Sequence, residues 1–74
     1  DITSMGIMVY PNPTGDMLNI DTRLDIEVEI YDLTGKLMTR EKSKRIDMTG
    51  YSNGVYNLIL IYKEKRFSSR VIKQ

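Results

Sequence analysis

Residues 26–36 read IEVEIYDLTGK and carry the clearest structural pattern in this chain of 74 residues. Isoleucine or valine stands at every second position in the first part, with polar or amphipathic residues between. Successive side chains of a β-strand point to opposite faces, so the alternation predicts a strand over residues 26–32 with one buried face. The following Asp-Leu-Thr-Gly predicts a hairpin turn, because Gly35 can adopt the positive φ of a bulged turn. A returning strand is expected over residues 36–42.

The rest of the chain repeats this pattern of short apolar runs separated by Pro, Gly, Asn and Asp. Such spacing predicts an all-β sandwich or barrel, and we find no helical stripe. Residues 55–62 hold a single polar residue, Asn57, so both faces of this strand are expected to be buried at the centre of a sheet. The other expected strands cover residues 7–10, 17–20, 46–48 and 66–73.

The composition excludes several kinds of chemistry. The chain has no Cys, His or Trp, which removes disulfides, Cys- or His-based zinc sites and Ser-His or Cys-His nucleophiles. A domain this small has no room for a deep substrate cavity. The longest apolar run, from Leu58 to Tyr62, is far shorter than the roughly 20 residues of a membrane helix. We therefore expect no catalytic activity, no cofactor, no metal and no direct membrane insertion.

Acidic side chains do not form a recognisable site. Glu27 and Glu29 share one strand face, and the alternation places both in water, where neither would work as a catalytic acid or base. Asp21, Asp25 and Asp32 lack the spacing of a calcium loop. The sequence therefore favours a solvated strand face over a catalytic or metal-binding site.

Charge is balanced in total and uneven along the chain. Residues 1–35 hold seven acidic side chains and one basic one, whereas residues 36–74 hold ten basic and three acidic ones. We expect the two halves to interleave in the sheet and neutralise each other. Nucleic-acid binding is the alternative, since the C-terminal hairpin is basic and contains aromatic residues, but these are better used as core. The residues concerned are Lys63, Lys65, Arg66, Arg70 and Lys73, with Tyr62 and Phe67.

Four ordered blocks of sequence go further than the periodicity does. They are VYPNP at residues 9–13, VEIYDLTGK at 28–36, SNGVY at 52–56 and RVIK at 70–73. Together they closely resemble the type A C-terminal sorting domain of the type IX secretion system (Por secretion system) of Bacteroidota. The resemblance extends over nearly the whole chain, and the ordered set is far more specific than any one block.

The resemblance implies a fold and a function. Members are small Ig-like β-sandwiches at the C-terminus of larger exported proteins, which fits a chain that opens without Met or a signal peptide. An N-terminal cargo domain would reach the periplasm by its own signal peptide. Outer-membrane shuttle and translocon proteins would then recognise the sorting domain and pass the cargo to the cell surface or medium. A surface sortase commonly removes the domain and joins the cargo to anionic lipopolysaccharide.

The family's recognition residues carry over where its blocks match. Residues 7–74 would be the sorting domain, and residues 1–6 a linker or the neighbourhood of the cleavage point. Structural roles are the alternative for the prolines, which end a strand, for the glycines, which turn one, and for the tyrosine, which packs in the core. The carried-over residues are Pro11, Asn12, Pro13, Gly35, Lys36, Gly54, Tyr56, Arg70, Val71, Ile72 and Lys73.

The last of these residues, Lys73, is the strongest recognition candidate, because a charge on a terminal strand contributes little to stability. Gln74 follows it, whereas many family members end on or next to the basic residue. Recognition by pairing at the last strand is expected, since a small open sandwich presents unpaired backbone groups there. The alternative function is an Ig-like carbohydrate-binding or adhesion module of a secreted enzyme, although such modules usually display Trp platforms.

Overall fold

The computed structural model describes residues 6–74, which form seven strands and no helix. The predicted all-β class and the number of strands are confirmed, and each predicted strand agrees with an observed one to within a few residues at its ends. The strands are β1 (Met8–Tyr10), β2 (Met17–Asp21), β3 (Glu27–Tyr31), β4 (Leu37–Glu41), β5 (Arg45–Asp47), β6 (Gly54–Tyr62) and β7 (Lys65–Lys73).

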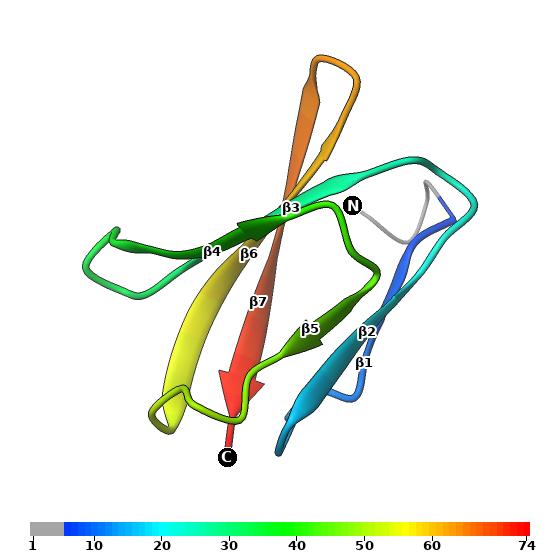
Figure 1. The fold of residues 1–74 in the computed structure, drawn as a ribbon. Helices are drawn as coiled ribbons and strands as arrows, with labels where there is room; N and C mark the ends of the chain where they lie inside the picture. The colour runs from blue at the N-terminus through cyan, green and yellow to red at the C-terminus, as the bar shows by residue number, and fades with distance from the viewer. Residues whose placement is uncertain (1–5) are drawn as a thin grey trace.

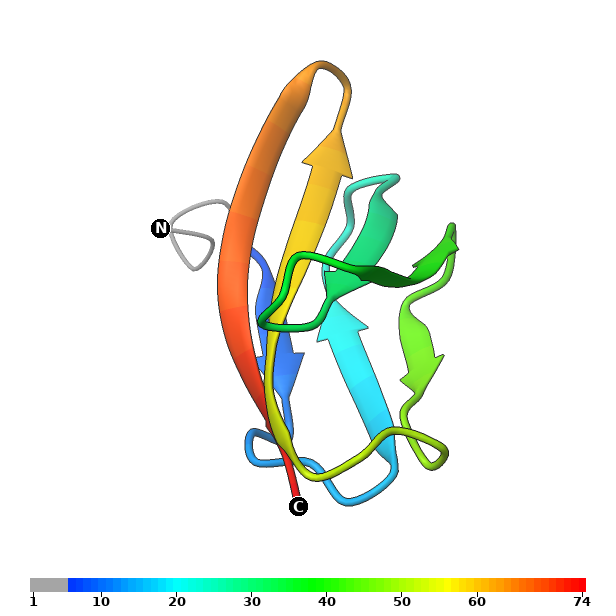
Figure 2. The same cartoon turned by 90° about the vertical axis from the view of Figure 1, so that its left-hand side faces the viewer.

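The strands form two antiparallel sheets packed as a small Ig-like sandwich (Figure 1). One sheet has three strands in the order β1-β2-β5, and the other has four in the order β4-β3-β6-β7. Consecutive strands β3 and β4, and likewise β6 and β7, form hairpins. The long β6–β7 hairpin extends beyond the rest of the molecule at one end, and the C-terminus lies at the other (Figure 2).

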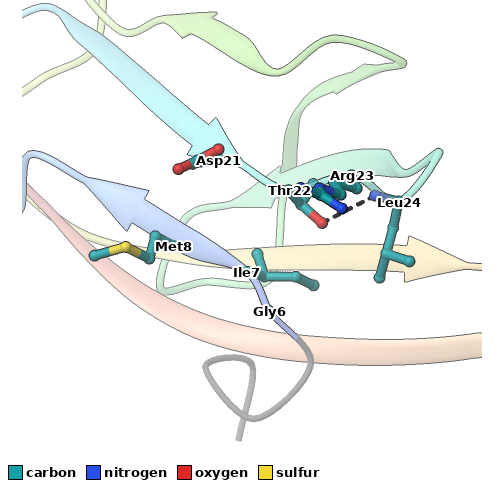
Figure 3. Close-up of a pocket in the computed structure, with 7 residues that line it drawn as sticks. All are labelled: Gly6, Ile7, Met8, Asp21, Thr22, Arg23 and Leu24. Carbon is teal, nitrogen blue, oxygen red and sulfur yellow. Dashed lines mark hydrogen bonds between the residues drawn. The ribbon is translucent and has the colours of Figure 1, made fainter.

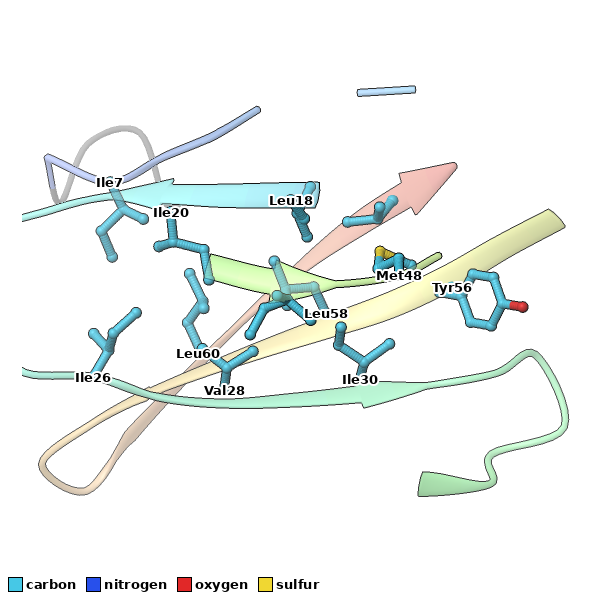
Figure 4. Close-up of a cluster of buried hydrophobic side chains, with 12 residues drawn as sticks. Ile7, Leu18, Ile20, Ile26, Val28, Ile30, Met48, Tyr56, Leu58 and Leu60 are labelled. Carbon is cyan, nitrogen blue, oxygen red and sulfur yellow. The ribbon is translucent and has the colours of Figure 1, made fainter. Parts of the chain in front are cut away.

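The core lies between the facing sides of the two sheets (Figure 4). Strand alternation brings apolar side chains of both sheets together, and their removal from water is the main favourable contribution to folding. Tyr62 and Phe67 pack against this core, as the sequence indicated. The buried apolar residues are Ile7, Leu18, Ile20, Ile26, Val28, Ile30, Ile46, Met48, Tyr56, Leu58, Leu60 and Val71.

Strand β6 lies inside the four-stranded sheet, between β3 and β7, as its apolar run predicted. The expectation that both of its faces are buried is wrong. Leu58 and Leu60 point into the core, but Ile59 and Ile61 are only half-buried on the opposite face. The reason is the sandwich itself, because the second sheet covers one side of the first and leaves the other to solvent.

Candidate functional site

The chain changes sheets directly after β1. Tyr10 still pairs with β2, whereas Thr14 lies beside β7 of the other sheet and forms a parallel bridge with Lys73. The backbone N–H of Thr14 donates to the carbonyl oxygen of Ile72 at 2.8 Å, and the N–H of Gln74 donates to the carbonyl of Thr14 at 2.9 Å. We call residues 11–14 the docked segment. Figure 2 shows it at the foot of the molecule, beside the C-terminal end of β7.

Asn12 completes this junction with its side chain. Its Nδ2 donates to the carbonyl oxygen of Arg70 at 3.0 Å, and its Oδ1 accepts from the backbone N–H of Ile72 at 2.9 Å. A carboxamide carries the same donor and acceptor as a peptide group, so Asn12 fills a strand position without extending the backbone there. The flanking Pro11 and Pro13 follow cis peptide bonds and have no N–H of their own to satisfy.

The SNGVY block lies on the other side of β7. Gly54 pairs with Lys73, and Tyr56 pairs with Val71. Tyr56 is buried, and its hydroxyl donates to the carbonyl oxygen of Ser52 at 2.7 Å. Three of the four sequence blocks therefore meet around the last third of β7, although they are far apart in the chain.

Side chains of the last strand alternate between the core and the solvent. Arg70 is exposed on the outer face of the sheet, and Ile72 is partly exposed beside it. Val71 points into the core, and Lys73 follows it inward with only 7% of its surface exposed. The Lys73 Nζ lies 3.5 Å from the carbonyl oxygen of Gln74. Lys73, the strongest recognition candidate in the sequence, is therefore buried, because its register places it on the inner face.

The fourth block forms the β3–β4 turn on the outer face of the same sheet. The carboxylate of Asp32 accepts hydrogen bonds from the Thr34 hydroxyl and from the backbone N–H groups of Thr34 and Lys36. These bonds hold the pKa of Asp32 below its ordinary value, and the bond from the Thr34 hydroxyl has the largest effect. Gly35 has φ +90°, so its predicted role in the turn is confirmed. The turn lines a shallow hollow together with Arg66 and Ser68.

The expectation that both strand glutamates lie in water is wrong, because Glu29 is buried. Its side chain is only 3% exposed, with Arg40 Nη2 at 2.7 Å and Arg66 Nη2 at 2.8 Å. The hydroxyl of Tyr31 also donates to it at 2.9 Å. Burial by itself raises the pKa of Glu29, but the bonds from Tyr31, Arg40 and Arg66 outweigh burial and lower it. Glu27, two residues earlier, is half-buried.

These ion pairs join the acidic first half of the chain to its basic second half. Strand β3 carries Glu29, whereas Arg40 and Arg66 come from β4 and β7. All three strands belong to one sheet, so oppositely charged side chains lie across its outer face. The interleaving predicted from the charge distribution is present at this cluster.

A second hollow, of about 470 Å³, lies where β1 begins and β2 ends (Figure 3). Ile7, Met8 and Leu24 line it with residues 21–23, and the Leu24 N–H donates to the Thr22 hydroxyl there. Within residues 6–74 we find neither three acidic side chains placed to hold a metal ion nor a helix suited to crossing a membrane.

The structure also shows residues of the candidate site that the sequence patterns did not indicate. Thr14 is completely buried, and its hydroxyl donates to the carbonyl of Met17, which anchors the docked segment. The exact position of Arg40 could not be predicted from the turn. A regular hairpin closed at Asp32–Lys36 would set Glu29 opposite Thr39, and the register shift between Ile30 and Tyr31 brings Arg40 there instead. The approach of Arg66 could not be predicted either, because it depends on the order of the strands.

The expected open edge at the last strand is only half correct. Strand β7 is an edge strand of its sheet, but the docked segment already bonds the backbone of its C-terminal part. Among the described residues, the backbone groups without a partner are therefore at the start of β7 rather than at its end. Residues 1–5, most of the predicted linker or cleavage-proximal segment, lie outside the described residues.

These features define a class of protein: a small Ig-like β-sandwich in which three of the four sequence blocks gather around the last strand. Comparison with known families identifies the particular one. Residues 8–74 match the family described as the secretion system C-terminal sorting domain, and the chain belongs to this family of type IX secretion signals. Such a signal directs export to the cell surface or out of the cell.

A curated relative supports the same assignment. The chain is 35% identical over 54 residues to a protein named beta-agarase D from Zobellia galactanivorans. The match covers 70% of this chain but only 11% of that protein. The chain thus corresponds to a small part of the relative.

Proposed function

We propose that this domain is the C-terminal address of a larger cargo protein, which an N-terminal signal peptide first delivers to the periplasm. Outer-membrane shuttle and translocon proteins of the type IX system recognise the folded domain and move the cargo across the outer membrane. A surface sortase then removes the domain, and the cargo is joined to anionic lipopolysaccharide. The family match over residues 8–74 is the observation that carries this proposal.

The recognised surface, in this proposal, is the junction of the docked segment with the end of β7. Pro11, Asn12 and Pro13 are exposed there beside Arg70 and Ile72. The hydrogen bonds that join them connect residues 58 and 60 positions apart, so the surface exists only in the folded domain. Recognition of this surface would therefore couple export to correct folding.

The remaining carried-over residues have different places in this proposal. Gly54, Tyr56, Val71 and Lys73 support the junction from β6 and from the inner face of β7, since their side chains or partners lie in or near the core. The exposed Gly35–Lys36 turn forms a separate contact on the outer face of the sheet. The name of the curated relative indicates that it is an enzyme. An enzyme as the cargo of this domain is compatible with the proposed arrangement.

The test is a fusion of these 74 residues to the C-terminus of a periplasm-targeted fluorescent protein, in a bacterium with the type IX system. A truncation without residues 71–74 is not sufficient alone, because it also removes Val71 from the core. We therefore pair it with Arg70→Glu, which changes an exposed side chain, and use Lys42→Glu at another exposed position as the charge-matched control.

We expect fluorescence at the surface or in the medium for the parent fusion and for Lys42→Glu, and periplasmic retention for Arg70→Glu and for the truncation. Circular dichroism of the purified variants checks that Arg70→Glu keeps its β-structure. Retention of a folded parent fusion in the periplasm would refute the sorting function. A glycan array with the same domain would then test the carbohydrate-binding alternative.

A further inference from the structure

Within residues 6–74, the first half of β7 has no backbone partner on the side away from β6. Strand β7 pairs with β6 along its whole length, and the docked segment bonds its other side only from Arg70 onward. Backbone groups of an antiparallel strand alternate between its two neighbours, so Arg66 and Ser68 direct both N–H and C=O away from β6. The N–H of Arg70 points the same way. Within residues 6–74 these groups have no backbone partner.

The side chains along this free edge are basic. Lys65, Arg66 and Arg70 are all exposed, and Lys63 lies in the adjoining turn with a single acidic residue, Glu64. Arg66 uses Nη2 to bind Glu29, but 55% of its side chain remains exposed. The edge therefore combines unpaired backbone groups with a positive potential, and a free edge of this kind is a template for another strand.

A second copy of the chain fits this edge poorly. If two β7 edges paired antiparallel about Ser68, Arg66 of each copy would lie directly opposite Arg70 of the other. Like charges at opposing positions of a strand pair are destabilising. Basic side chains thus discourage self-association while leaving the edge available to a strand of opposite charge.

We propose that residues 65–70 of β7 form a docking edge for an extended acidic segment of another protein, which adds to the four-stranded sheet as a fifth strand. In antiparallel pairing the segment carries acidic side chains opposite Arg66 and Arg70 and a small residue opposite Ser68. Its intervening apolar side chains lie on the face of the half-buried Phe67. The pairing ends at Arg70, because Asn12 already bonds the Arg70 carbonyl. Only the role of this contact in export rests on the proposed sorting function.

The first test uses the 74-residue chain and a blocked synthetic pentapeptide with the order glutamate, valine, threonine, valine, glutamate. We expect the amide protons of Arg66, Ser68 and Arg70 to shift in NMR titrations and to exchange more slowly with solvent when the peptide is bound. Binding should weaken as salt is raised, since the charges are exposed. In one control peptide lysine replaces glutamate, and in a second the backbone nitrogens are methylated. Neither control peptide should bind.

Two substitutions at one position separate backbone pairing from charge attraction. Ser68→Pro removes an outward N–H and leaves the ladder with β6 in place, so binding should fall about tenfold or more. Ser68→Thr keeps that N–H and should bind like the parent. Circular dichroism checks that both variants remain folded. Equal binding by Ser68→Pro and Ser68→Thr, or protection of amides elsewhere in the domain, would overturn the proposal, as would a stable dimer of the parent chain.

The reporter fusion then distinguishes the two proposals. If the parent fusion is exported and Ser68→Pro stays in the periplasm while Ser68→Thr is exported, the edge acts in sorting. Export of Ser68→Pro at the parent level would show that the translocation step does not use this edge, and sorting itself would still hold. A parent fusion that is not exported would refute the sorting function, whereas the peptide titration would continue to decide the docking edge.

Discussion

The side chain of Asn12 occupies a strand position beside Ile72, accepting its backbone N–H at 2.9 Å across 60 residues of sequence. The same carboxamide donates to the carbonyl of Arg70 at 3.0 Å. One residue thus joins the first loop of the domain to its last strand and closes the edge that the strand would otherwise present there. Pro11 and Pro13 on either side lack the N–H groups with which an ordinary strand could do the same.

Asn12→Ala should reduce the free energy of unfolding by about 1 kcal/mol, because two exposed hydrogen bonds to β7 are lost. The amide proton of Ile72 should also exchange faster. Urea unfolding and hydrogen exchange measure these effects. Asn53→Ala is the matched control, since Asn53 is exposed and shows no side-chain hydrogen bond within the described residues. An Ile72 amide that exchanges at the parent rate in Asn12→Ala would contradict this role.

Glu29 should make the domain less stable at acidic pH. Its pKa lies below the ordinary value of 4.5 in the folded state, so the unfolded chain binds the proton more readily. Its stabilising contribution is complete above about pH 4.5 and is lost as the pH falls through the lower folded-state pKa. Glu29→Gln should lack this part of the pH dependence and lose roughly 1 kcal/mol at neutral pH, because both arginine partners are well exposed.

The measurement for Glu29 is urea unfolding over a series of pH values from neutral to strongly acidic. Glu27→Gln removes the same charge from the same strand, and Glu27 makes no ion pair within residues 6–74. This control should therefore retain the acid-dependent loss seen in the parent chain. Parallel pH curves for the parent and Glu29→Gln would show that the arginine cluster does not hold this carboxylate ionised.

Gly35→Ala should lower stability by about 1 kcal/mol, because a Cβ is unfavourable at φ +90° even though nothing lies near it. For a domain of this size that corresponds to a fall in Tm of about 4–8 °C. Gly50→Ala is the control, since Gly50 also has open space around it and no positive φ. A loss of export in Gly35→Ala with an unchanged Tm would instead assign Gly35 to recognition.

Lys73→Met should be as stable as the parent chain or slightly more stable. The lysine is only 7% exposed, and within residues 6–74 its ammonium has one weak acceptor, the main-chain oxygen of Gln74, so an apolar side chain of similar length fits the inner face. Lys73→Glu should lose about 2 kcal/mol or more. Thermal unfolding checks both variants, with exposed Lys42→Met as the control. A folded Lys73→Met fusion that is not exported would assign recognition to the charge itself.

The periodicity of the chain was sufficient to predict its strands. Alternation in residues 26–32, the Asp-Leu-Thr-Gly turn and the short apolar runs elsewhere are local properties, because the side chains of a strand alternate whatever it pairs with. The ordered sequence blocks likewise identified the family, since they depend on residue identity and spacing alone. The all-β class, the seven strands and the sorting-domain family could therefore be predicted from the residues alone.

The order of the strands and the burial of individual charges could not be predicted in this way, because both depend on which segments meet in space. Glu29 belongs to an alternating strand whose polar face should be wet, yet Arg40 and Arg66 arrive from two other strands and cover it. Lys73 turns inward because β7 continues its register into the core, and the end of β7 is closed because residues 12–14 cross to it from the other sheet. The sequence by itself determined the strands and the family, whereas tertiary structure decided which edge stays open, since an edge is defined only by the neighbours a strand lacks.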